Sequence, residues 1–146
     1  MRYTVSTIVN KPIEEVVDVI KDPNQAKFWM EGLQRIEQIS GEPGEVGSTS
    51  ELEFLMGKRH VEMIETVISN TLPDEITLEY DSGKSVHNVV RCVFEEIDAT
   101  TTKYTTHNLF EFSGIGMKLM GMIFPGMFKK QSQKYLDSFK SYVESK

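Results

Sequence analysis

Hydrophobic positions change their period three times along the chain. Residues 2–9 (RYTVSTIV) alternate between polar and mostly β-branched apolar residues, which is typical of a strand. Four apolar residues then follow at the i, i+3, i+4, i+7 spacing of a helix with one buried face: Ile13, Val16, Val17 and Ile20. This helix should end at Asp22, because Pro23 disfavours a helical conformation in the residue before it. Asp22 can then cap a second short helix, with Gln25 three residues after the cap.

Between residues 33 and 112 the period shortens to that of strands. Polar and apolar residues alternate, or nearly alternate, in runs at 50–56, 60–68, 75–80, 86–97 and 103–112. Segments rich in turn-forming residues, such as GEPGEVG and DSGKS, separate the runs, as they do between antiparallel strands joined by hairpins. We therefore expect an antiparallel sheet of six to seven strands, counting the strand at the N-terminus.

The last segment returns to a helical period. One stripe of this helix consists of the mostly apolar residues Phe128, Ser132, Tyr135, Leu136, Phe139, Tyr142 and Val143. An antiparallel sheet needs one face covered, and this C-terminal helix is the only predicted element long enough to cover it. The sequence therefore predicts one α+β domain over residues 1–146. In it a curved antiparallel sheet wraps around the long C-terminal helix, and two short helices follow the first strand.

This order of elements resembles the helix-grip fold of the START-like (SRPBCC) superfamily, in its polyketide cyclase/dehydrase-like branch. Segment 11–29 (KPIEEVVDVIKDPNQAKFW) is similar to the opening of that family. It has a proline entering the first helix, Asp-Pro between the helices and a tryptophan closing the second. Segment 43–54 (PGEVGSTSELEF) resembles the family's Pro-Gly-x-x-Gly turn into the next strand. These motifs specify a fold and carry no chemistry of their own.

Charge is distributed unevenly along the chain. The net charge is −6, yet the residues from Gly114 onward carry six lysines against Asp137 and Glu144, a balance of +4, which leaves −10 for residues 1–113. The acidic total argues against nucleic-acid binding, which depends on basic patches that neutralise phosphates. A solvated helix face is the simplest interpretation of the lysines. Docking on a protein partner or on an anionic membrane surface is the weaker alternative.

No recognisable catalytic or metal-binding motif is present. The single cysteine, Cys92, excludes an internal disulfide, and its apolar setting (VVRCVF) predicts a buried structural thiol. His60, His87 and His107 lack the spacing of a zinc site, so we expect no metal and no cofactor, and we assign no catalytic residue. Without an export signal at Met1 we expect a cytoplasmic protein. Its apolar runs are too short for stable membrane insertion.

Alternation also predicts which strand residues face the interior. The more apolar faces of segments 86–97 and 103–112 contain two amides, Asn88 and Asn108, whereas His107 points outward. A buried amide without a partner costs a few kcal/mol, so each should bond to the protein, to water or to a ligand.

The family resemblance implies an apolar cavity between the sheet and the final helix. Segment 114–131 (GIGMKLMGMIFPGMFKKQ) would form a soft wall of this cavity, because methionine adapts to ligands of varied shape. Gap-filling core is the alternative interpretation of its methionines. Pro125 either kinks the final helix near 121–126 and opens an entrance, or it marks the start of a shorter final helix.

The leading hypothesis is binding or transport of a small hydrophobic molecule, such as a lipid, an isoprenoid or a polyketide-like compound. The predicted ligand-binding residues are Trp29, Met30, Phe54, Met63, Tyr80, Phe94, Tyr104, Phe110, Met117, Met120 and Phe124. The alternative is a polyketide cyclase/dehydratase-like enzyme acting in the same cavity. That function needs a buried acid or base, and the candidates are Tyr80, Tyr104, Glu53 and Arg91. A wall without titratable groups favours carriage, and an inward tyrosine, histidine or carboxylate favours chemistry.

Overall fold

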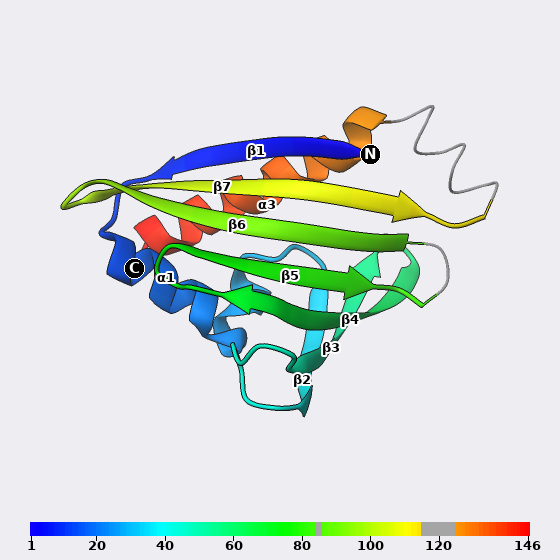
Figure 1. Cartoon of the computed structure of the whole chain (residues 1–146). Coiled ribbons are helices and arrows are strands. Elements are labelled where there is room, and N and C mark those ends of the chain that lie inside the picture. The colour runs from blue at the N-terminus through cyan, green and yellow to red at the C-terminus, as the bar shows by residue number, and fades with distance from the viewer. Residues whose placement is uncertain (84–85, 115–124) are drawn as a thin grey trace.

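The computed structural model of the chain describes residues 1–83, 86–114 and 125–146 (Figure 1). Its elements follow the predicted order of strand, two short helices, further strands and final helix. They are β1 (Arg2–Val9), α1 (Ile13–Lys21), η1 (Pro23–Phe28), β2 (Leu33–Ser40), β3 (Thr49–Met56), β4 (Arg59–Asn70), β5 (Glu75–Asp81), β6 (Val86–Asp98), β7 (Thr101–Phe112) and α3 (Pro125–Glu144).

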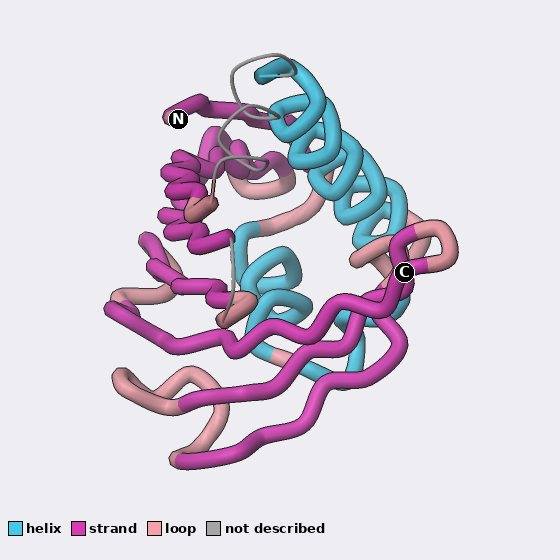
Figure 2. The backbone as a smooth tube through the Cα atoms, turned by 90° about the vertical axis from the view of Figure 1, so that its right-hand side faces the viewer, coloured by secondary structure: helices cyan, strands magenta, loops and turns pink. Residues whose placement is uncertain are grey.

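The strands form one antiparallel sheet of seven strands in the order β1-β7-β6-β5-β4-β3-β2. Consecutive strands from β2 to β7 are neighbours, as the hairpin-type separators predict, and β1 pairs with β7 at the edge. Viewed from the side in Figure 2, the sheet curves and the helices lie within its concave side. The predicted helix-grip architecture, a curved sheet around the C-terminal helix, is confirmed.

The two short helices form at the predicted places. The α1 stripe is buried at Ile13, Val16 and Val17, and Ile20 packs against the same core. Asp22 caps η1, since its carboxylate accepts hydrogen bonds from the backbone N–H of Asn24 (2.9 Å) and from the side chain of Gln25 (3.0 Å). The second helix is a 3-10 helix of six residues.

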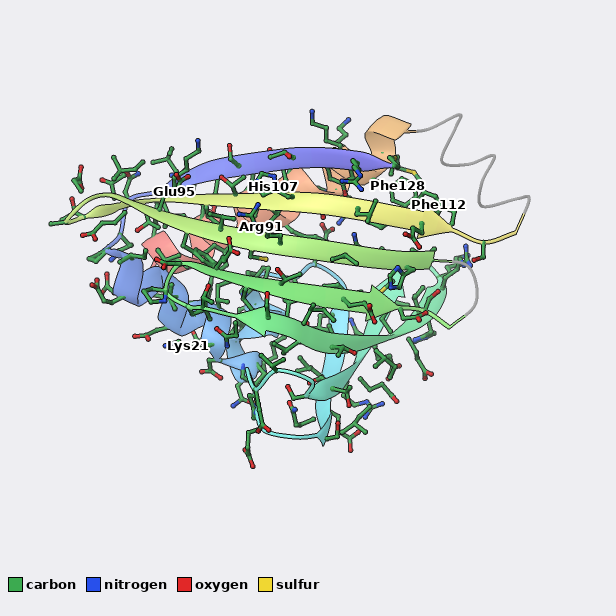
Figure 3. The ribbon with its side chains drawn as sticks, in the orientation of Figure 1. Lys21, Arg91, Glu95, His107, Phe112 and Phe128 are labelled. Atoms are coloured by element: carbon green, nitrogen blue, oxygen red, sulfur yellow. The ribbon has the colours of Figure 1, made fainter. Side chains whose placement is uncertain are left out.

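Alternation decides which strand side chains face α3. The residues predicted for the inner faces of β6 and β7 include six that are buried: Asn88, Cys92, Phe94, Tyr104, Thr106 and Asn108. His107 is exposed, and Figure 3 shows His107 and Arg91 on the face of the sheet turned away from α3. The predictions of a buried Cys92 and an outward His107 are therefore confirmed.

Helix α3 covers the concave face with the predicted apolar stripe. Leu136, Phe139 and Val143 are almost completely buried, and Phe128 and Tyr142 are half-buried. The helix begins at Pro125, the position that suits a proline because the first turn needs no backbone N–H donor. This start agrees with the second interpretation of Pro125. The predicted bend near 121–126 falls mostly outside the described residues.

Candidate functional site

The interior has two ends with different packing. At the end near α1, aromatic rings fill the space between sheet and helix. The ring centroids of Phe94 and Tyr104 lie 4.6 Å apart, and Phe139 makes edge contacts at 5.1 Å with both Tyr104 and Trp29. Val16 and Phe139 have no exposed surface. We call this region, defined by Val9, Val16, Phe94, Tyr104, Phe139 and Val143, the packed end.

At the opposite end the inner face carries a row of polar side chains across five strands. The cross-strand pairs are Gln38 with Ser50, Ser50 with Glu65, Glu65 with Tyr80, and Tyr80 with Asn88. Directly opposite residues in antiparallel strands share a face, with Cβ atoms about 4.5–5.5 Å apart. The register therefore holds these side chains side by side on the inner face. We call Glu65, Tyr80 and Asn88 the polar row.

Apolar side chains surround the polar row, and many of them are only half-buried. Met63, Leu78, Val90 and Phe110 lie on the same inner face and keep part of their surface accessible, and Leu78 and Val90 also pack against the core cluster of the packed end. At the strand ends nearby, Phe110 and Phe112 each lie 5.1 Å from Phe128 of α3, between ring centroids (Figure 3 labels Phe112 and Phe128). We call this region the polar end. It consists of the polar row together with Met63, Leu78, Val90, Phe110, Phe112 and Phe128.

Burial changes the acid–base properties of the polar row. Desolvation raises the pKa of the Glu65 carboxyl, and its hydrogen bond with the Tyr80 hydroxyl opposes this shift. Desolvation also raises the pKa of Tyr80 well above its ordinary value, and the negative charge of Glu65 adds to the shift. A carboxyl group with a raised pKa beside a phenol is the arrangement that acid–base chemistry uses.

Other polar groups on the inner face have protein partners. The Asn88 side-chain N–H donates to the Leu109 carbonyl (3.1 Å), and the Asn108 side-chain N–H donates to the Thr106 hydroxyl (3.0 Å). The Tyr104 hydroxyl lies 3.6 Å from the Cys92 Sγ, and burial raises the pKa of the Cys92 thiol to about 12. Both amides are thus bonded to the protein. Such a high pKa makes Cys92 an unreactive structural thiol.

The described members of the predicted ligand-binding set divide among the packed end, the polar end and a second buried cluster. Phe54 is buried in a second cluster, on which Met30, Met63 and Tyr80 pack. Phe94 and Tyr104 are each 3% exposed and belong to the packed end, and Trp29 lies half-buried against Phe139. Phe110 is at the polar end. Three predicted residues lie outside the described part of the chain: Met117, Met120 and Phe124.

Of the four candidate acids and bases, two face outward. Glu53 contacts Arg35 (3.5 Å) and His60 (3.5 Å) on the outer face, and Arg91 pairs there with Glu75 (2.9 Å). The proposal of Glu53 and Arg91 as buried groups is therefore wrong. Their neighbours in the alternating pattern face inward, so both must face solvent.

The inward carboxyl group is Glu65, which the sequence analysis missed. The signal was the alternation within β4, which puts residue 65 on the same face as Met63 and Val67. Tyr80 and Tyr104 do face inward, as the enzyme hypothesis requires.

The three histidines lie on the outer face. His107 Nδ1 is 3.0 Å from the Thr4 hydroxyl, His60 contacts Glu53, and His87 Nε2 is 3.2 Å from a Glu79 carboxylate oxygen. No cluster of histidine, cysteine and acidic residues suited to a metal ion occurs in the described ranges. Within the same ranges, no helix is long and apolar enough to span a membrane.

Two hollows lie on the outside of the molecule. One, of about 430 Å³, is lined on the outer face of β3–β5 by Ile64, Thr66 and four acidic side chains (Glu51, Glu62, Glu79 and Asp81), together with neighbouring residues. The other, of about 490 Å³, lies on the solvent side of α3 between Phe28 and Tyr142. Neither includes the polar row.

The sequence matches the family described as polyketide cyclase / dehydrase and lipid transport over residues 1–144, nearly the whole chain. The chain belongs to this family. No curated protein sequence matches significantly. Membership agrees with the helix-grip fold of the START-like superfamily that the sequence motifs predict.

Solved structures share the fold at low sequence identity. The Zhui aromatase/cyclase from Streptomyces sp. R1128 matches with a TM-score of 0.80 and 14% identity, over 99% of this chain and 93% of that chain. A conserved protein from Geobacillus kaustophilus matches with a TM-score of 0.77 and 16% identity, over 99% and 96%. Ara h 8.0201 matches with a TM-score of 0.75 and 14% identity, over 100% and 99%. At these identities the likeness establishes the fold alone.

Proposed function

We propose that the protein binds a small hydrophobic molecule between the sheet and α3, at the polar end. The supporting observation is the difference in packing within one inner face. Protein interiors normally pack as tightly as organic crystals, as the packed end does. Met63, Leu78 and Phe110 point inward but keep accessible surface. Inward apolar side chains that are left half-covered are suited to contact an apolar ligand.

The ligand contacts would come from three strands of the inner face at the polar end. Met63 and Leu78 offer aliphatic surface from β4 and β5, and Phe110 offers an aromatic ring from β7. The polar row would orient the polar group of the ligand. Phe94 and Tyr104 are left out of the proposed site because they are packed in the core. Met117, Met120 and Phe124 stay predictions.

Binding of the neutral dye Nile red tests this proposal. We expect saturable binding with one dye per chain. Native mass spectrometry of protein purified without detergent should also reveal an apolar adduct. Met63→Trp should weaken dye binding about tenfold or more, because the larger side chain fills the proposed site. Ile64→Trp places the same ring at the next residue on the outer face, where Ile64 is 37% exposed, and should change binding less than about twofold.

Two results would contradict the proposal. One is the absence of saturable dye binding to the folded protein. The other is equal weakening by Met63→Trp and Ile64→Trp, which would locate the dye away from the inner face.

Enzyme activity of the cyclase/dehydratase type is the second candidate function, and the Glu65–Tyr80 pair favours it. In this scheme the Glu65 carboxylate takes a proton from a carbon between two carbonyl groups of a poly-β-ketone. The resulting carbanion forms a carbon–carbon bond with a ketone of the same chain, and Tyr80 protonates the new alkoxide. Loss of that hydroxyl as water completes a redox-neutral cyclisation. A raised carboxyl pKa suits this base, since its proton affinity lies closer to neutral pH.

Incubation with a poly-β-ketone thioester tests the second candidate by mass spectrometry. An enzyme would convert it to a product lighter by one water, and Glu65→Gln would abolish the conversion. Binding without conversion would leave carriage as the function of the site.

A further inference from the structure

Among the described residues, the interior contains an acid without a basic partner. Within the described residues, Glu65 is the one carboxylate on the inner face that is not exposed, since Glu96, which lies opposite Thr102, is exposed near the end of β6. The lysine, arginine and histidine side chains of the same residues lie on the outer face or at the surface. Other titratable groups on the interior side are Tyr3, Tyr80, Cys92, Tyr104 and Tyr135. Burial raises the pKa of each, so all are neutral near pH 7.

This charge pattern is unfavourable for an acidic ligand. A ligand carboxylate beside an ionised Glu65 would bring two negative charges together. Beside a protonated Glu65 it could accept the proton in a hydrogen bond, but one negative charge would still remain without a cation. In either protonation state the described side chains of the site would leave one charge uncompensated, which is costly where burial removes it from water.

Uncharged polar groups fit the same positions. The Tyr80 hydroxyl can donate to a ligand carbonyl or hydroxyl, and a protonated Glu65 can donate as well. The Asn88 side-chain N–H is already bonded to the Leu109 carbonyl, which orients the amide and leaves its Oδ1 as an acceptor. Because Asn88 lies opposite Tyr80 and Tyr80 opposite Glu65, these groups can engage one polar group of a ligand together.

We propose that the polar row selects apolar ligands whose polar group is an uncharged hydroxyl or carbonyl, and that Glu65 discriminates against carboxylates of the same chain length. This inference rests on the proposed binding function and specifies its ligand class. It separates neutral lipids, alcohols and keto compounds from free fatty acids by the charge of one group. Selectivity of this kind comes from a repulsive element as well as from attractive contacts.

Competition between two matched ligands against Nile red tests the proposal. Dodecan-1-ol and dodecanoate have equal chain lengths and differ in the polar group. The parent protein at pH 8 should bind the alcohol about tenfold more tightly or better, a difference of about 1.4 kcal/mol. Any apolar site favours the alcohol to some degree. The deciding quantity is therefore the change in the alcohol-to-carboxylate affinity ratio when the charge of Glu65 is removed.

Glu65→Gln should lower this ratio at least about fivefold, mainly because dodecanoate binds more tightly. Glu62→Gln is the matched control: it removes the same charge from the same strand, but from the exposed outer face, and should leave the ratio within about twofold. Glu65→Met removes the charge without adding an amide and should lower the ratio in the same direction. It keeps the test decisive if Glu65→Gln does not fold.

The outcomes separate this inference from the proposed function. A ratio that falls less than fivefold in both Glu65 variants would overturn the inference, as would dodecanoate binding the parent more tightly than dodecan-1-ol. In those cases ligand binding itself would stand. Failure of both ligands to displace the dye, or failure of the dye to bind, would overturn the proposed function and the inference with it.

Discussion

The packed end and the polar end belong to one inner face but differ in how they use side chains. At the packed end aromatic rings from β6, β7 and α3 contact one another at centroid distances of 4.6–5.1 Å, and Phe139 is fully buried. At the polar end, Glu65, Tyr80 and Asn88 lie among half-covered apolar residues. The comparison indicates that one region stabilises the fold while the other carries the candidate site.

This division has a physical cause. A close-packed core gains the most free energy per residue, whereas a buried carboxyl group costs free energy unless it is paired. Glu65 is partly buried and bonds to Tyr80, but its desolvation still disfavours the ionised carboxylate and so lowers stability near neutral pH. Its presence at the less tightly packed end agrees with the general observation that binding residues are often unfavourable for folding.

Alanine substitutions at the two ends should differ most in how much they lower the free energy of unfolding. Phe139→Ala should lower the free energy of unfolding by about 3–5 kcal/mol, because it leaves a cavity in a close-packed region. Phe112→Ala should cost only about 1–2 kcal/mol, since its ring is half-buried, but it should weaken Nile red binding. Chemical denaturation measures both free energies. Equal losses in the two variants would break the distinction between the ends.

Trp29 provides a second, smaller test at the boundary of the packed end. Trp29→Ala should lower the free energy of unfolding by about 2–3 kcal/mol, less than a fully buried aromatic, because the indole is half-buried against Phe139. Trp29→Phe should retain most of the stability. It keeps a ring there and removes an indole N–H that has no partner within the described part of the chain. A denaturation midpoint unchanged by Trp29→Ala would show that the indole contributes nothing to the fold.

The smallest effect depends on pH and concerns Glu65. Its pKa is raised in the folded state, so the folded protein holds this proton more strongly than the unfolded chain does. The parent therefore loses stability as pH rises from the ordinary glutamate pKa, about 4.3, through the raised value. The Glu65→Gln variant has no ionisable group at this position, so it does not lose stability in this way. Its stability relative to the parent should increase from pH 4 to pH 8.

Denaturation at several pH values measures this difference, with Glu62→Gln as a control that should show little pH-dependent change. A difference between Glu65→Gln and the parent that stays constant, or decreases, as pH rises would mean that the carboxyl group is solvated.

Much of the fold could be predicted because its signals are local. The spacing from Ile13 to Ile20 gave the buried face of α1, and Asp22 followed by Pro23 marked the boundary with η1. The alternation in β6 and β7 gave the inward Asn88 and the outward His107. Period and capping depend on neighbouring residues, so they can be recognised without the tertiary structure.

The candidate site was harder to predict because it depends on pairing between strands. Alternation alone puts Glu65 on an inner face, and the same pattern shows that Glu53 must face outward beside Phe54. The alignment of Glu65 with Tyr80 and Asn88 depends on strand register, which a bulge between Val67 and Ser69 shifts. Which end of the inner face packs tightly depends on how α1 and α3 cover the sheet, and local patterns do not contain that information.

The proposed site for an apolar molecule is the polar end of the inner face. A titration of isotope-labelled protein with dodecan-1-ol, followed by NMR, would locate the bound molecule residue by residue. We expect saturable shifts at the backbone amides of Glu65, Tyr80 and Asn88, with little change at Phe94 and Phe139. Shifts concentrated at the surface hollow between Phe28 and Tyr142, or no saturable shifts at all, would contradict it.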